Sequence, residues 1–315
     1  MAILKVDTIS GIGTEGPVFE GDIEFTSQNF LTLPKGDTTQ RGRGRGIIFG
    51  GYSPNPAGHV STIQSIEIQS FGNAQDFGDL SSVRSQMGAV SSSTRAVSCG
   101  GGNDTPSDYT DTNTCEFVTI ANTSNTTDFG DLTVSRQPYK GCSNDTRGII
   151  FGGYIHPTNS NTIDFITIAT TGNAVDWGDL TSSRNYIMAS GDATRGLATG
   201  SPLGGGANVI DYWSTQTAGN AADFGDLTQN RRQGAGTSDT TRAVFGGGYQ
   251  DGGLEHTNIM DYVTVQTLGN ATDFGDLIND IATNIGATCN GTIGHWAGGY
   301  YHPNASNIIQ KVTIQ

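Results

Sequence analysis

Hydrophobic and polar residues alternate along short stretches of the chain, and glycines or small polar residues separate these stretches. Residues 162–170, TIDFITIAT, alternate with a period of two, as does a strand that is buried on one face. Residues 147–154, RGIIFGGY, form a short apolar run that ends in a glycine pair. Gly-Asn pairs, such as Gly172-Asn173, supply the positive φ of a tight turn. Since no stretch predicts a helix longer than one turn, we expect an all-β chain.

The same elements recur about every 50 residues. An arginine opens each of the first five copies, and a glycine pair follows it in all of these except the fourth, which has Gly200-Ser201. The segment DFGDL, or DWGDL in the third copy, begins at Asp76, Asp128, Asp176, Asp223 and Asp273. The arginines are Arg45, Arg95, Arg147, Arg195 and Arg242. A unit of four short strands cannot bury both faces of its sheet alone, so the units are expected to pack radially.

The repeat resembles a known family. The order of arginine, short strand, FGGY, loop, alternating strand, aromatic residue and Ser-Arg resembles the kelch repeat over residues 21–315. This resemblance implies a six-bladed kelch-type β-propeller. The chain departs from the kelch pattern because DFGDL replaces the usual Trp-containing segment, in which Trp occurs only at Trp177.

The last copy is incomplete, which bears on how the ring closes. It ends with the alternating stretch 308–314 and lacks a DFGDL strand. Near the N-terminus, Gly21-Asp22-Ile23 resembles the Gly-Asp-Leu part of that missing segment. We therefore expect residues near 20–33 to complete the sixth blade beside residues 308–314. Such closure removes exposed sheet edges, which invite aggregation.

Composition and charge narrow the classes of partner. The chain has 46 glycines, so its core is expected to be rich in tight turns. Its 30 acidic and 16 basic residues give a net charge of −14, which argues against nucleic acid and anionic membranes as partners. No apolar run approaches the roughly 20 residues that cross a bilayer. The opening MAILKVDTIS lacks the features of a signal peptide, so we expect synthesis in the cytoplasm.

Nothing in the cysteines or the acidic loop predicts a metal or another cofactor. The four cysteines, Cys99, Cys115, Cys142 and Cys289, show no zinc spacing and are expected to be buried and reduced. Asp104, Asp108 and Asp111 share one loop, but their spacing matches no standard calcium loop, which favours a solvated loop.

The repeated charged residues favour structure over catalysis. In a four-stranded blade, the turn between strands one and two lies on the same face as the turn between strands three and four. We therefore expect Arg147 and its equivalents to bond a DFGDL carboxylate or a backbone carbonyl in the same or the adjacent blade. An active site needs one asymmetric arrangement, and no Ser/His/Asp trio or phosphate-binding loop stands out, so we expect no enzymatic activity.

The opposite face is less uniform and carries the candidate ligand-binding residues. Tyr and His cluster in the loops between the second and third strands, and such side chains stack on sugars or anchor a protein partner. In the alternative interpretation, the tyrosines pack the blade edge and the histidines are solvated. The candidates are Tyr52, His59, Tyr154, His156, Tyr249, His256, Tyr300, Tyr301 and His302.

Residues 1–20 stand outside the repeat and form an N-terminal arm. Its apolar residues Ile3, Leu4, Val6 and Ile9 precede a glycine-rich tether, an arrangement suited to adding a strand to a partner's sheet. The first 25 residues also resemble the openings of virion structural and tail-fibre proteins of tailed bacteriophages, particularly marine and cyanobacterial ones. That resemblance implies a location in the virion, docking to other virion proteins through the arm, and contact with a host surface glycan or protein.

Two alternatives to a virion protein stay open at this stage. The first is a bacterial or cellular kelch module that binds a protein or a glycan. The second is a propeller enzyme, such as a copper oxidase or a glycan lyase. A kelch-type copper oxidase needs a Cys–Tyr cofactor pair and converging metal ligands, which the sequence does not supply.

Overall fold

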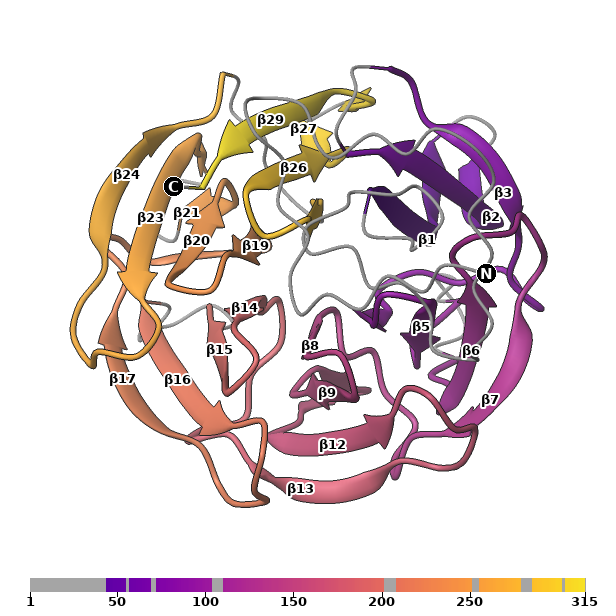
Figure 1. Cartoon of the computed structure of the whole chain (residues 1–315), viewed down its shortest axis with the longest axis horizontal. Helices are drawn as coiled ribbons and strands as arrows, with labels where there is room; N and C mark the ends of the chain where they lie inside the picture. The colour runs from indigo at the N-terminus through magenta and orange to yellow at the C-terminus, as the bar shows by residue number, and fades with distance from the viewer. Residues whose placement is uncertain are drawn as a thin grey trace, which may run out of the picture. The chain divides into compact units, whose positions relative to one another are not determined.

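The computed structural model describes residues 44–54, 57–68, 72–103, 110–200, 208–250, 255–278, 285–301 and 304–314. All of them lie in one compact unit, residues 37–315. Six antiparallel sheets follow one another around a ring (Figure 1), so this unit is a six-bladed β-propeller. The described residues contain strands and turns without a helix, which confirms the all-β, six-bladed prediction.

Blades 2 to 5 each have four described strands, which run from the centre of the ring outward in chain order. Blade 2 consists of β4 (Gly88–Ser91), β5 (Arg95–Cys99), β6 (Thr114–Thr119) and β7 (Thr127–Asp131). Blade 3 consists of β8 (Gly141–Ser143), β9 (Arg147–Phe151), β12 (Thr162–Thr167) and β13 (Val175–Asp179). Blade 4 consists of β14 (Met188–Gly191), β15 (Arg195–Thr199), β16 (Val209–Ser214) and β17 (Ala222–Asp226). Blade 5 consists of β19 (Ala235–Ser238), β20 (Arg242–Gly246), β23 (Ile259–Thr264) and β24 (Thr272–Asp276).

Blades 1 and 6 each have three described strands and meet where the ring closes. Blade 1 consists of β1 (Arg45–Pro54), β2 (Ala57–Glu67) and β3 (Gln75–Asp79), and blade 6 of β25 (Gly286–Cys289), β26 (Ile293–Ala297) and β29 (Ile309–Thr313). Gly46 of β1 lies so close to Thr288 of β25 that a Cβ on Gly46 would be 2.6 Å from the threonine Cγ2. The predicted completion of blade 6 by residues 20–33, and the arm 1–20, lie outside the described residues.

Short ribbons extend several blades beyond their main sheets. Blade 3 adds β10 (Tyr154–Ile155) and β11 (Thr158–Asn159), and blade 6 adds β27 (Tyr300–Tyr301) and β28 (Asn304–Ala305). Blade 5 adds β21 (Tyr249–Gln250) and β22 (Glu255–His256), and β18 (Arg231–Arg232) pairs with β21. Each ribbon lies in the connection between the second and third strands of its blade. We call the face that carries these connections the loop face, and the opposite face the turn face.

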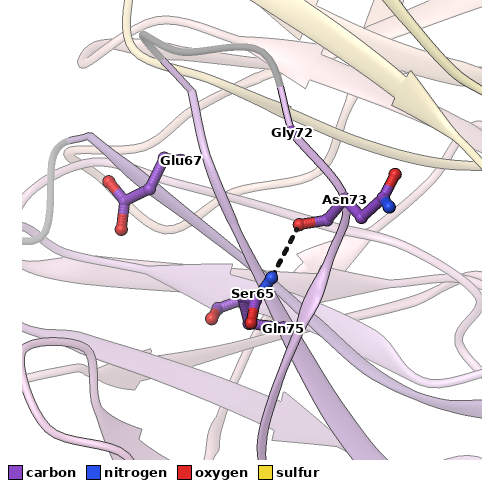
Figure 2. Close-up of a pocket in the computed structure, with 5 residues that line it drawn as sticks. All are labelled: Ser65, Glu67, Gly72, Asn73 and Gln75. Carbon is purple, nitrogen blue, oxygen red and sulfur yellow. Dashed lines mark hydrogen bonds between the residues drawn. The ribbon is translucent and has the colours of Figure 1, made fainter.

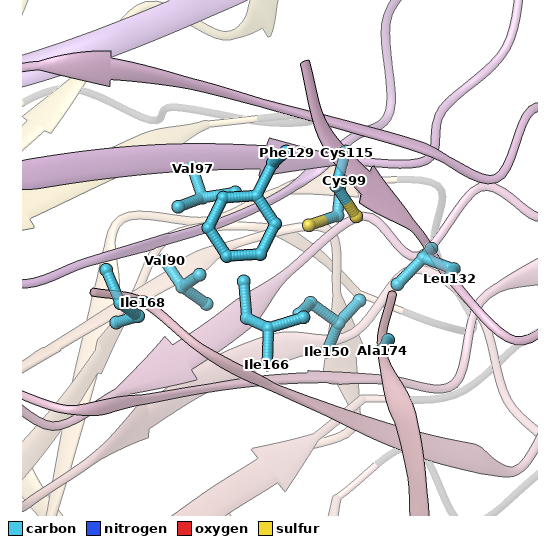
Figure 3. Close-up of a cluster of buried hydrophobic side chains, with 10 residues drawn as sticks. All are labelled: Val90, Val97, Cys99, Cys115, Phe129, Leu132, Ile150, Ile166, Ile168 and Ala174. Atoms are coloured by element: carbon cyan, nitrogen blue, oxygen red, sulfur yellow. The ribbon is translucent and has the colours of Figure 1, made fainter. Parts of the chain in front are cut away.

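The hydrophobic core is divided among the interfaces between neighbouring blades. Figure 3 shows the cluster between blades 2 and 3, where Phe129 of β7 packs with Ile150 of β9 and Ile166 of β12. Cys99 and Cys115 are fully buried in this cluster, and burial raises the pKa of the Cys99 thiol. No disulfide joins the four cysteines; Cys99 and Cys115 are buried as predicted, whereas Cys142 and Cys289 are only half-buried. Because the buried apolar side chains lie between neighbouring blades, each blade is stabilised mainly by packing against its neighbours.

Candidate binding face

The repeated arginines on the turn face join each blade to the next. Arg147 Nη1 donates to the carbonyl oxygens of Thr215 at 2.9 Å and Gln216 at 2.6 Å, both in blade 4. Its guanidinium also lies 5.3 Å from the centre of the Trp177 ring. Arg45, Arg95, Arg195 and Arg242 likewise donate to carbonyls of the following blade. The predicted arginine–carbonyl bonds are therefore confirmed, and the partners are carbonyls of the adjacent blade.

The DFGDL strand and the Gly-Asn turn form a second contact between blades, which we call the outer latch. The Asp131 N–H donates to Asn173 Oδ1 at 3.1 Å, and the Gly172 N–H donates to the Phe129 carbonyl at 2.7 Å. A Cβ on Gly130 would lie 2.5 Å from the Gly172 carbonyl, so the Gly172-Asn173 turn can pack here only because residue 130 is a glycine. The equivalent asparagines Asn125, Asn220 and Asn270 accept bonds of 3.0, 3.1 and 3.1 Å.

Four buried arginines form a third set of contacts, which the sequence analysis did not predict. Each arginine precedes the innermost strand of a blade and pairs with a carboxylate on the third strand of that blade. The pairs are Arg84–Glu116, Arg136–Asp164 at 2.8 Å, Arg184–Asp211 at 3.1 Å and Arg231–Asp261 at 2.9 Å. No side chain in these pairs is more than 4% exposed.

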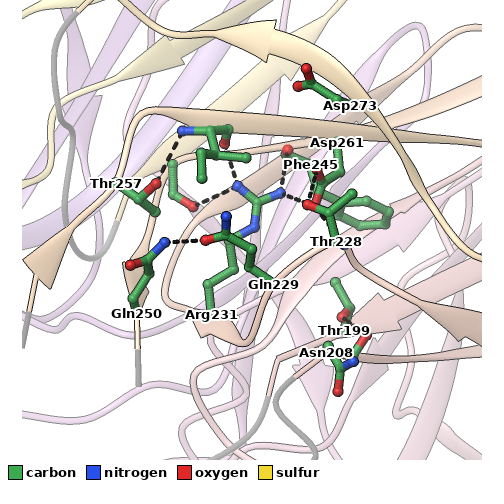
Figure 4. Close-up of polar contacts among 12 residues, drawn as sticks. Thr199, Asn208, Thr228, Gln229, Arg231, Phe245, Gln250, Thr257, Asp261 and Asp273 are labelled. Carbon is green, nitrogen blue, oxygen red and sulfur yellow. Dashed lines mark hydrogen bonds and ion pairs between the residues drawn. The ribbon is translucent and has the colours of Figure 1, made fainter. Parts of the chain in front are cut away.

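Further hydrogen bonds reach both charged groups of such a pair, as Figure 4 shows for Arg231, although its Nε has no partner among the described residues. Arg231 Nη2 donates to the Phe245 carbonyl at 2.9 Å, and the Thr228 hydroxyl donates to Asp261 Oδ1 at 2.7 Å. Burial lowers the pKa of Arg231, and the neighbouring Asp261 carboxylate opposes that shift. In blade 6 the neutral Gln310 occupies the register position of Asp261, and its Oε1 accepts the Ile278 N–H at 2.6 Å.

The candidate tyrosines and histidines of the loop face meet in pairs within their own blades. Tyr52 and His59 of blade 1 have ring centroids 5.5 Å apart, and Tyr249 and His256 of blade 5 have the same separation. In blade 3, Tyr154 and His156 are 5.8 Å apart. These blades alternate around the ring, so the structure places three separate pairs and not one cluster. The side chains of Tyr300 and Tyr301, and His302, lie outside the described residues.

The centre of the loop face holds residues that the sequence analysis missed. Tyr139 and Tyr186 precede the innermost strands of blades 3 and 4, and their rings contact edge to face with centroids 5.1 Å apart. The Arg232 guanidinium lies 5.4 Å from the Tyr186 ring centre and 5.5 Å from that of Tyr249. Lys140 Nζ donates to the Ile285 carbonyl at 2.5 Å. These residues lie in linkers between blades, where no repeat motif marks them.

Other features of the described residues add no competing site. No group of three or more His, Cys, Asp or Glu residues is placed to hold a metal ion within the described ranges. Asp111 of the acidic loop accepts hydrogen bonds from Gln137 Nε2 at 2.8 Å and from the His156 N–H at 3.1 Å, so it joins blade 2 to blade 3. The other two acidic residues of that loop, Asp104 and Asp108, lie outside the described residues. No helix among the described residues is long and apolar enough to span a membrane. Figure 2 shows a small pocket at the outer turn of blade 1, lined by Ser65, Glu67, Gly72, Asn73 and Gln75.

The chain was compared with known proteins. No protein-family model matches it, and no curated protein matches it. The structure shows a six-bladed β-propeller. Since no family model or curated protein matches, the kelch and bacteriophage resemblances of the sequence stay predictions.

Proposed function

We propose that the chain is a non-enzymatic structural protein of a phage virion, in a tail fibre or another appendage. In this proposal residues 1–20 dock the protein to other virion proteins, and the kelch-type propeller presents its loop face to a host surface. The phage assignment rests on the resemblance of the first 25 residues, and Ile3, Leu4, Val6 and Ile9 supply the apolar side chains of the docking strand.

The use of the repeated charged residues in contacts that hold the ring together is the observation that best supports a structural role. The turn-face arginines bond carbonyls of the next blade, as Arg95 does with Ile168 and Ala169 at 3.1 and 2.8 Å. The buried arginines pair with carboxylates, as Arg136 does with Asp164. The first set joins neighbouring blades and the second fastens each linker to the blade that follows it, which suits a rigid scaffold that displays its loops.

A second candidate function is a bacterial or cellular kelch module that binds a glycan or a protein. The Tyr–His pairs favour it, since they place aromatic rings and imidazoles on one face of the propeller. Tyr52 is 61% exposed and contacts His59, so its ring is accessible to a partner. Aromatic side chains of this kind give a large contact area at a small cost in conformational entropy.

The experiment that separates the two candidates is quantitative mass spectrometry of purified virions of the phage that encodes the chain. A virion protein is expected in the particles at a constant ratio to the other structural proteins, through repeated density-gradient purification. A non-structural protein from the same infected cells serves as the control for contamination. Recovery of the chain only in the soluble fraction, like that control, would contradict the virion proposal and favour the cellular module.

A further inference from the structure

Lys140 places an amine at the centre of the ring. It directly precedes β8, the innermost strand of blade 3, whereas its hydrogen-bond partner Ile285 directly precedes β25, the innermost strand of blade 6. These two blades lie opposite each other (Figure 1), so the side chain reaches across the centre on the loop face. An ammonium group has three N–H donors, and the Ile285 carbonyl takes one of them at 2.5 Å.

A series of rings and a guanidinium, each in contact with the next, begins at the residue before Lys140. Tyr139 precedes Lys140 in the chain and contacts Tyr186. Arg232 lies against the rings of both Tyr186 and Tyr249, and Tyr249 contacts His256. The series runs from the centre of the loop face to the ribbon of blade 5. Tyr139, Lys140, Tyr186 and Tyr249 are half-buried, so each keeps some accessible surface.

The backbone that carries these residues is repeated, but the side chains are not. The residue two positions before the innermost strand has a left-handed φ in four blades: 61° at Gln86, 64° at Tyr139, 54° at Tyr186 and 61° at Gln233. The Tyr139 N–H donates to the Gln86 carbonyl at 3.1 Å, and the Gln233 N–H to the Tyr186 carbonyl at 2.9 Å. These four residues therefore lie at equivalent positions around the centre, and only two of them are aromatic.

The neighbouring positions vary in the same way. The residue before the left-handed position is Ser85, Pro138, Asn185 or Arg232, and the residue after it is Met87, Lys140, Ile187 or Gly234. A purely structural requirement of the repeat would recur in all of blades 2 to 5, as the buried arginines do. Among the described residues at these positions, the aromatic rings and cations instead occur only in blades 3 to 5, which is the asymmetry expected of a binding site.

We propose that this sector of the loop face binds a saccharide of several rings that carries carboxylate groups. Lys140 pairs with one carboxylate through its remaining N–H donors, and the tyrosine rings pack against the C–H faces of the sugars. The length of the series from Lys140 to His256 favours an oligosaccharide over a single sugar. The proposal deepens the loop-face contact suggested above and rests on that part of the proposed function.

The surroundings of Lys140 fit this role. Burial lowers the pKa of its amine to about 8, so most of the amine is protonated at neutral pH. Since the chain as a whole carries a charge of −14, binding of an anion requires a local cation at the contact. A carboxylate beside the ammonium would stabilise the charged form and raise this pKa.

The experiment uses tri-galacturonic acid as the probe and its fully methyl-esterified form as a control that keeps the rings but removes the charge. The chain has four lysines, so selective ¹³C-labelling of lysine in the full-length protein gives few Cε NMR signals and leaves the N–H donors in place, and the Lys140 signal is assigned with a Lys140→Met variant. We expect the acid to shift the Lys140 signal and to raise its pKa, and the ester to do neither. Calorimetry is expected to show an affinity for the acid that falls about tenfold to a hundredfold in Lys140→Met.

A Lys311→Met variant, which removes a positive charge from β29, serves as the matched control and is expected to retain the affinity for the acid. Tyr186→Leu is expected to weaken binding of both the acid and the ester, because both use the rings. Equal affinity of the acid for wild type and Lys140→Met, or failure of the acid to bind, would overturn the proposal. These outcomes leave virion location untouched, because the mass-spectrometric test does not depend on saccharide binding.

Discussion

The outer latch predicts that two glycines of the same motif respond differently to alanine. Gly225 of blade 4 and Gly275 of blade 5 both have left-handed φ values, 147° and 121°. A Cβ on Gly225 would lie 2.4 Å from the Gly269 carbonyl oxygen and 2.9 Å from the Asn270 nitrogen. A Cβ on Gly275 meets no atom within 4 Å among the described residues. The two substitutions therefore share backbone strain but differ in their contact with the next blade.

The magnitude follows from these contacts. An alanine held in this backbone region costs roughly 1–3 kcal/mol, and both variants incur that cost. Gly225→Ala also forces the Gly269-Asn270 turn outward, at about 1–3 kcal/mol for overpacking. It weakens two hydrogen bonds, Gly269 N–H to the Phe224 carbonyl at 2.9 Å and Asp226 N–H to Asn270 Oδ1 at 3.1 Å. Each bond contributes about 1 kcal/mol. Gly225→Ala is thus expected to destabilise the protein by about 2–4 kcal/mol more than Gly275→Ala does.

The assay is equilibrium unfolding in urea, monitored by tryptophan fluorescence, with both variants and the wild type measured side by side. An unchanged m-value supports the use of one cooperative transition for the comparison. If the two variants unfold with free energies within about 0.5 kcal/mol of each other, the inter-blade contact carries little energy. The assignment of DFGDL and Gly-Asn to an outer latch would then be wrong.

Three further predictions follow from the other contacts. Asp164→Ala leaves Arg136 buried without its carboxylate and is expected to lower the free energy of unfolding in urea by about 3–5 kcal/mol. The double variant Asp164→Ala, Arg136→Met is expected to regain most of that loss. Equal stability of the single and the double variant would refute the energetic role of the ion pair. Because burial lowers the pKa of Lys140 to about 8, the unfolded chain binds more protons between pH 8 and pH 10.5, so stability is expected to rise across this window. Since the side chain is half-buried, the gain is about 1–3 kcal/mol, and the dependence should be absent in Lys140→Met. Deletion of residues 1–33 is expected to open the ring and cause aggregation, whereas deletion of 1–15 should leave a soluble propeller by light scattering; similar behaviour of both would contradict closure by residues 20–33.

The repeat was sufficient to predict the fold because its spacing and its strand patterns are local features of the sequence. The contacts between blades are not local. Gly130 and Asn173 lie in different repeats, and neither residue alone indicates the latch that they form. The sequence therefore predicts the Gly-Asn pairs only as turns, which is correct but incomplete.

The buried ion pairs escaped prediction because alternation assigns each residue to one face of a strand. Period two in β12 places Ile163 inside and Asp164 outside, yet both are fully buried. A register shift against β13 falls between these two residues, and Arg136 from the preceding linker covers the carboxylate. In a propeller both faces of a blade pack against neighbours, so a polar position in the pattern does not have to face water.

The candidate site was predicted in part. The Tyr–His pairs lie on the loop face, but in separate blades, so their use as one binding surface stays a prediction. Tyr139, Lys140 and Tyr186 precede short inner strands and belong to no repeated motif. Only the ring geometry brings them together, because it places linkers from successive blades around one centre.

The measurement that tests the proposed function most directly is the incorporation of a protein that lacks residues 2–15 into assembled virions. Lys140→Met, which alters the loop face and leaves the arm intact, is the matched control. The truncated protein is expected to keep the melting temperature of the full chain and to be absent from purified particles, while Lys140→Met is incorporated normally. Incorporation of the truncated chain at the level of the full chain would show that docking runs through the propeller, which would contradict the proposed role of the arm.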